Sequence, residues 1–142
     1  MDTPGTAPNL EEVAATAAAL SGATAGVQYT YSKWVKAGAG ANGKTVRLVI
    51  REIGGAVATG TTAIQLFTLT TAWQRLILTG TIVQNDRTGV RGGFVTGNSG
   101  TPVTTGDVVL IDDAQFEPGS VATPYIHTDG ATASRPALRW LA

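Results

Sequence analysis

Apolar and polar residues alternate along much of the chain between residues 26 and 117, and this period of two is typical of strands with one buried face. In the first such run, residues 27–36, Tyr29 and Tyr31 fall on one face of the predicted strand and Trp34 falls on the other. The remaining predicted strands cover residues 44–53, 56–69, 73–82, 88–96 and 106–116. The segment 56–69 is interrupted near Gly60 and contains either one strand or a broken pair of strands.

Clusters of turn-forming residues separate the predicted strands. Stretches rich in glycine or containing proline occupy residues 38–43, 54–55 and 97–102. The pair Gly92-Gly93 stands inside a strand pattern instead, and it predicts a β-bulge there. Short strands at this spacing predict an all-β fold, namely a jelly-roll β-sandwich of antiparallel strands that forms one domain over residues 26–117.

The two ends of the chain lack the alternating pattern. Residues 1–25 are expected to form an N-terminal arm with a short helix over residues 10–21, because Asn9 can cap a first turn and Glu12 follows three residues later. A partly ordered linker is the alternative. Residues 118–142 are expected to be an extended tail with several prolines. Apolar residues of both ends are predicted to contact the sandwich or a neighbouring subunit: Leu10, Val13, Leu20, Leu138, Trp140 and Leu141.

The balance of charges and the absence of cysteine argue against several classes of function. The 142 residues include 10 basic and 10 acidic side chains, so we expect no general attraction to nucleic acid or to an anionic membrane. The chain contains no cysteine, which excludes disulfides and thiolate chemistry. No apolar run approaches the roughly 20 residues that span a bilayer, and the first residues do not resemble a signal peptide.

Candidate catalytic residues are few. His127 is the only histidine and lies in the proline-containing tail, so a second histidine cannot complete a metal site. No nucleophile-elbow motif is present. We therefore expect a protein that binds or assembles and is not an enzyme.

Six segments and their order along the chain are more informative about family than the composition is. These segments are residues 29–38, 45–48, 69–75, 106–111, 114–119 and 122–126. Together with the continuation through Pro136, this order resembles the carbohydrate-binding-module-like jelly-roll domains of bacteriophage virion proteins. The resemblance covers roughly residues 26–136.

The resemblance implies a virion structural protein, for which there are two settings. The first is a capsid decoration, or cement, protein on the capsid exterior, made in the host cytoplasm, forming a homotrimer and bridging copies of the major capsid protein. The alternative is a carbohydrate-binding module of a phage tail or fibre that contacts host glycans, with Trp34 and Trp73 as the candidate sugar-stacking residues. An accessory domain of a secreted enzyme is a third interpretation.

The resemblance also brings a metal into consideration, because sugar-binding jelly rolls often hold a structural Ca²⁺. Asp112, Asp113 and Glu117 are the candidate ligands. Adjacent residues of a regular strand point to opposite faces, so Asp112 and Asp113 could bind one ion only if the backbone is kinked. A solvated or salt-bridged role is the expected alternative, and no cofactor is expected.

Overall fold

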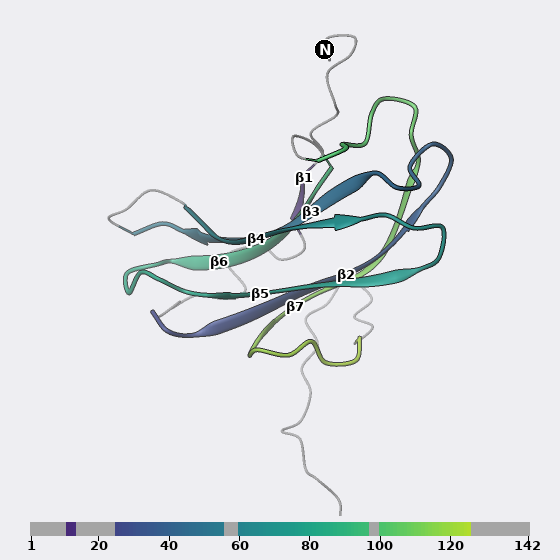
Figure 1. Ribbon diagram of the computed structural model, residues 1–142. Coiled ribbons are helices and arrows are strands. Elements are labelled where there is room, and N and C mark those ends of the chain that lie inside the picture. Colours follow the sequence, from purple (N-terminus) through teal and green to yellow (C-terminus); the bar gives the residue numbers. More distant parts are fainter. Residues whose placement is uncertain (1–10, 14–24, 56–59, 97–99, 126–142) are drawn as a thin grey trace, which may run out of the picture.

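The computed structural model describes residues 11–13, 25–55, 60–96 and 100–125, and it shows two antiparallel sheets stacked face to face (Figure 1). One sheet has four strands in the order β1 (Glu11–Val13), β6 (Gly89–Val95), β3 (Thr45–Ile53) and β4 (Gly60–Thr68). The other has three strands in the order β5 (Gln74–Thr81), β2 (Gln28–Ala37) and β7 (Val109–Pro118). The predicted all-β sandwich of antiparallel strands is therefore confirmed.

Most loops between successive strands cross from one sheet to the other. Among the described strands, only β3 and β4 follow each other within one sheet, and each of the connections from β2 to β3, β4 to β5, β5 to β6 and β6 to β7 crosses to the other sheet. A strand with one apolar face must bury that face, and successive strands do so by facing each other across the sandwich.

The helix predicted over residues 10–21 is wrong where the structure describes it. Residues 11–13 form β1, which pairs antiparallel with β6 through Glu11–Val95 and Val13–Gly93. A short helix is marginal without tertiary contacts. A strand here instead satisfies backbone groups that β6 would otherwise leave exposed at a sheet edge. In the described part of the chain, no helix is long and apolar enough to cross a membrane.

The core lies between the sheets and is centred on aromatic side chains. Tyr31 is fully buried, and its ring meets Phe116 edge to face with 6.3 Å between the ring centroids. Tyr29 stacks on the same Phe116 ring at 5.5 Å. The opposite sheet contributes Leu48, Ile50, Val90 and Phe94 to this cluster.

The bulge predicted at Gly92-Gly93 is also wrong. The ladder between β3 and β6 is regular from Arg47–Val95 to Ile53–Gly89. Gly92 is needed for close packing, because a Cβ atom there would lie 2.6 Å from Cγ of Tyr31. The irregularities observed lie elsewhere, in the β2–β7 ladder between Ser32 and Trp34 and in the β3–β4 ladder between Ile50 and Arg51.

A buried ion pair fixes one end of the sandwich. The Glu52 carboxylate accepts hydrogen bonds from Thr62 Oγ1 at 2.6 Å and from the backbone amides of Val83 and Gln84 at 2.8 and 3.0 Å. Arg87 Nε lies 3.8 Å from Glu52 Oε1. Burial alone would raise the pKa of Glu52, but these hydrogen bonds and the Arg87 charge outweigh it and hold the pKa below its usual value.

A charged turn fixes the other end. The Asp107 carboxylate accepts hydrogen bonds from the Lys44 ammonium and from the amide and hydroxyl of Thr104, the last two at 2.6 and 2.8 Å. The Lys44 and Thr104 hydrogen bonds lower the pKa of Asp107 to about 2. Because residues 104–107 are held in this turn, β7 begins at Val109 and not at Gly106 as predicted.

Candidate functional site

The outer face of the three-stranded sheet carries Trp34 and several polar side chains of β2. Tyr29, Tyr31 and Val35 point into the core, so by alternation the intervening residues lie on the outer face. These outer residues are Thr30, Ser32, Trp34 and Lys36. Trp34 thus lies on the face opposite to the two tyrosines, as strand alternation predicts.

Trp34 is the middle residue of a row that crosses all three strands. It pairs directly with Arg75 on β5 and with Asp112 on β7. Side chains that are directly opposed in an antiparallel ladder have Cβ atoms about 4.5–5.5 Å apart. The partly buried indole of Trp34 is therefore flanked by a cation on one side and a carboxylate on the other.

Trp73 reaches the same face from the start of β5. It immediately precedes Gln74, which pairs with Val35, and the alternation along the strand places Trp73 on the side of Arg75. Its position is fixed by a hydrogen-bonded turn in which Thr70 Oγ1 donates to Gln74 Oε1 at 2.8 Å. Its side chain is 46% exposed. The two tryptophans predicted as sugar-stacking residues thus come to one face of one sheet.

After β7 the chain turns back across the same face, and residues 119–125 form what we call the strap. The Gly119 amide donates to the Gln28 carbonyl at 2.8 Å, and the Gly119 carbonyl accepts a bond of 2.8 Å from Thr30 Oγ1. Thr79 Oγ1 donates to the Ser120 carbonyl at 3.3 Å. The strap covers one end of the outer face, which is why Thr30 and Ser32 are fully buried there.

Arg75 joins the strap to the sheet. Its Nη2 atom donates to Ser32 Oγ at 3.0 Å and to the Thr123 carbonyl at 2.6 Å. The Thr123 amide in turn donates to both oxygens of Glu117 at 3.2 Å. Arg75 therefore marks the boundary between the covered end of the face and the end that carries Trp34 and Trp73.

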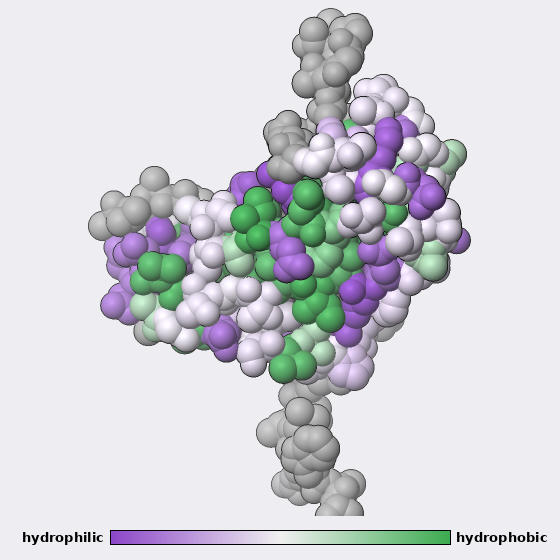
Figure 2. Space-filling model, viewed as in Figure 1, coloured by the Kyte–Doolittle hydropathy of each residue, from purple (hydrophilic) through white to green (hydrophobic). Residues whose placement is uncertain are grey.

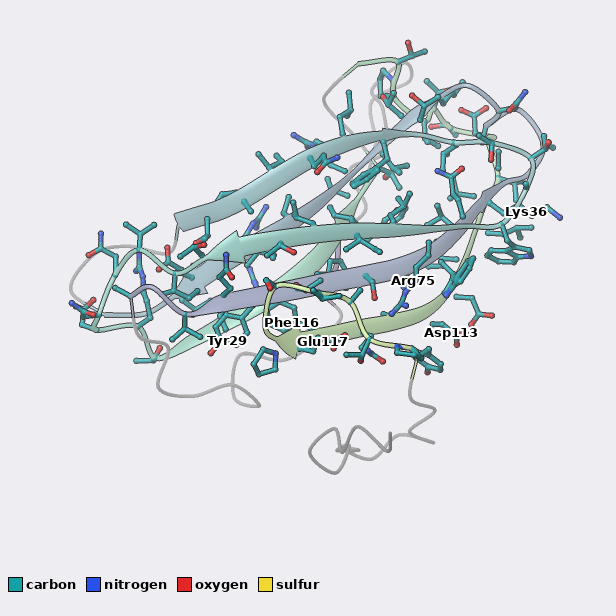
Figure 3. All side chains as sticks on the ribbon, turned by 60° about the horizontal axis from the view of Figure 1, so that its bottom comes forward. Tyr29, Lys36, Arg75, Asp113, Phe116 and Glu117 are labelled. Atoms are coloured by element: carbon teal, nitrogen blue, oxygen red, sulfur yellow. The ribbon has the colours of Figure 1, made fainter. Side chains whose placement is uncertain are left out.

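The β2–β7 irregularity shapes the rim of the uncovered end. Ser32 pairs with Gln115 and Trp34 with Asp112, so two residues of β7 face the single residue between them on β2. One of these, Asp113, has a left-handed backbone with φ of 44°. Figure 3 shows Asp113 at the same end of the sheet as Lys36 and Arg75, whereas Tyr29 lies toward the other end.

The three calcium candidates are only partly brought together. The Asp112 carboxylate accepts the Asp113 amide at 2.9 Å, and the Glu117 carboxylate is occupied by the Gln115 amide and by Thr123. The kink that shared coordination would require does occur at Asp113. Within the described ranges, however, no three histidine, cysteine, aspartate or glutamate side chains are grouped as a metal site requires.

The predicted contact residues of the two ends fall largely beyond the described part of the chain. Leu10, Leu20, Leu138, Trp140 and Leu141, together with His127, lie outside the described residues. Val13 lies in β1, where the backbone pairing with Gly93 is described. The predicted contacts of these residues therefore stay predictions.

Sequence reasoning missed the roles of Arg75, Thr123 and Glu117 in holding the strap. Residues 32, 75 and 123 are far apart along the chain, and no local spacing connects them. For Glu52 the sequence gives a weak indication of a buried polar contact, because a carboxylate at an inward position of an apolar strand must find hydrogen-bond partners.

Comparison with known proteins identifies similar folds. Neither the models of protein families nor the curated proteins give a match to the sequence. Among solved structures, the N-terminal cellulose-binding domain of the β-1,4-glucanase C of Cellulomonas fimi is similar, with a TM-score of 0.54 and 18% identity over 83% of this chain and 75% of that one. The chain has the fold of a carbohydrate-binding module.

A second similar structure is described as CBM4. It has a TM-score of 0.49 and 20% identity over 78% of this chain, and the present chain covers 59% of it, which is less than two thirds. The likeness to the cellulose-binding domain confirms the carbohydrate-binding-module-like sandwich that the sequence resembles. At 18% identity it concerns the fold alone.

Proposed function

We propose that this chain is a non-catalytic carbohydrate-binding module, and that it holds a sugar on the uncovered outer face of the three-stranded sheet. The observation that carries the proposal is the row Arg75–Trp34–Asp112, with Trp73 on the same face. An exposed indole offers a flat apolar surface to the C–H face of a pyranose ring. Flanking charged groups supply donors and acceptors for its hydroxyls.

Loss of the tryptophans tests this proposal. Trp34→Ala and Trp73→Ala should each weaken binding to a glycan found on an array by about tenfold or more, because a good stacking contact is worth about 1.4 kcal/mol or more. Binding is measured by calorimetry, with circular dichroism to confirm the fold. Val83→Ala is the matched control, since Val83 is also exposed but follows β5 at the opposite end of the sandwich. Unchanged affinity of both tryptophan variants would contradict the proposal.

We further propose that the module serves on a bacteriophage particle, either as a decoration protein bound to the major capsid protein or as a tail module that meets host glycans. The order of segments between residues 29 and 126 supports this setting. Electron microscopy of particles that carry the chain should place it on the capsid exterior in the first case and on the tail in the second. Particles that assemble without incorporating the chain would refute both.

A further inference from the structure

The four edge strands of the described sandwich differ in how they discourage pairing with another chain. An exposed edge presents free backbone N–H and C=O groups, and proteins protect such edges by short length, charge, proline or bulges. β1 has three residues, of which two are glutamate. β7 combines Asp112, the left-handed Asp113 and Pro118. β5 carries Arg75, and the strap is bonded to it through Thr79.

β4 has none of these protections over most of its length. Its nine residues include no charged residue and no proline. Ile64 and Leu66 are 52% and 42% exposed, although both are large and apolar. The one irregularity, opposite Ile50 and Arg51, lies toward the Gly60 end and leaves residues 63–68 in a regular ladder with β3. Figure 2 shows hydrophobic surface gathered on the side where β4 lies above β5.

We propose that the edge of β4 that pairs with no described strand binds β4 of a second copy of this chain, in antiparallel orientation and centred on Gln65. The two four-stranded sheets would then join into one continuous sheet across a twofold axis. In this register Ile64 of each copy opposes Leu66 of the other on the outer side. Ala63 opposes Phe67 on the inner side in the same way.

The sequence of β4 favours a second copy as the occupant of this edge. An isologous contact requires a surface that complements itself, and a register centred on Gln65 pairs each apolar residue of the segment with an apolar residue. Centring on Ile64 instead would oppose Leu66 to Thr62, so the apolar match would be lost. No like charges are opposed, because the strand is uncharged, and a chain of zero net charge does not repel its own copies.

The mass of the protein in solution tests the pairing. Sedimentation over a concentration series should show a dimer for the native chain, and Leu66→Lys should shift the midpoint of dimerisation by about tenfold or more toward monomer, because an inserted lysine is a usual edge protection. Val83→Lys is the control, since Val83 is 66% exposed but follows the end of β5. A native monomer, or a trimer or dimer that Leu66→Lys leaves unchanged, would overturn the proposal.

A crosslink tests the register. The chain has no cysteine, so a disulfide in Gln65→Cys can form only between copies. Directly opposed residues in a ladder lie within the Cα separation of about 4.4–6.8 Å that a disulfide accepts. Mild oxidation should therefore give a covalent dimer from Gln65→Cys much faster than from Thr81→Cys, which lies on the edge strand β5. Equal rates for the two variants would refute the β4 pairing.

Discussion

At the scale of single residues, the fit of Tyr31 depends on the missing side chain of Gly92. The tyrosine ring enters the core from β2, and Gly92 of β6 faces it from the other sheet. The Gly92 backbone is not left-handed, since its φ lies outside the range that only glycine adopts readily. Close packing, and not backbone conformation, therefore selects glycine at this position.

This packing makes Gly92→Ala destabilising. Alanine in place of glycine normally stabilises a strand slightly through the unfolded state, but the added methyl would lie 2.6 Å from Tyr31 Cγ. We expect a loss of about 1–3 kcal/mol in the free energy of unfolding, measured with urea and tryptophan fluorescence. Tyr31→Ala removes the two nearest ring atoms, Cγ and Cδ2, and so should relieve the clash, and the double variant should lose less than the sum of the single losses. Additive losses would show that the two residues do not interact.

Residues whose roles follow from local alternation could be predicted, and those that act through distant partners could not. The opposed orientations of Trp34 and Tyr31 follow from the period of a strand. The glycine pair in β6 predicts a bulge when only the sequence is considered, because a sequence shows that a side chain is missing but not what fills the space. No local pattern marks a role for Arg75, since its partners Ser32 and Thr123 lie 43 and 48 residues away.

At the scale of elements, the strap decides how much of the outer face is open. It lies over the end that carries Thr30 and Ser32 and is tied down at Gly119, Ser120 and Thr123. The open part extends from Trp34 to the end of β2, and it is edged by Arg75 and Asp112. A sugar bound there would therefore meet the strap at one side, so the strap and the tryptophans together define the proposed site.

Strands were predicted well where alternation is strong, and less well where tertiary contacts decide. The observed β2, β3 and β5 lie within two residues of their predicted bounds, because buried side chains recur at a period of two. The segment around Glu12 has helix signals, but pairing with β6 outweighs them in a short segment. The strap has no pattern at all, since hydrogen bonds to the sheet and not burial of an apolar face hold it.

At the scale of the whole molecule, two anionic side chains stabilise opposite ends of the sandwich. Glu52 joins the end of β3 to the connection that follows β5. Asp107 joins Lys44, which precedes β3, to the turn that precedes β7. Each carboxylate is held in its charged form by hydrogen bonds and by a nearby cation, so the pKa of each is lowered by folding.

These lowered pKa values predict that stability falls in acid. A carboxyl group with a lower pKa in the folded state binds protons more tightly when the chain is unfolded, so its contribution is complete above the unfolded value and is lost as the pH falls. For Glu52 the loss begins near its ordinary pKa of 4.5, and for Asp107 it extends from about 3.8 to about 2. Glu52→Gln should lower the free energy of unfolding at pH 7 by about 3 kcal/mol, because the buried Arg87 charge would lose the carboxylate charge that faces it. Urea unfolding at pH 7, 5, 4 and 3 should then show a shallower decline for Glu52→Gln than for the native chain. Parallel pH curves would mean that Glu52 does not contribute charge-dependent stability.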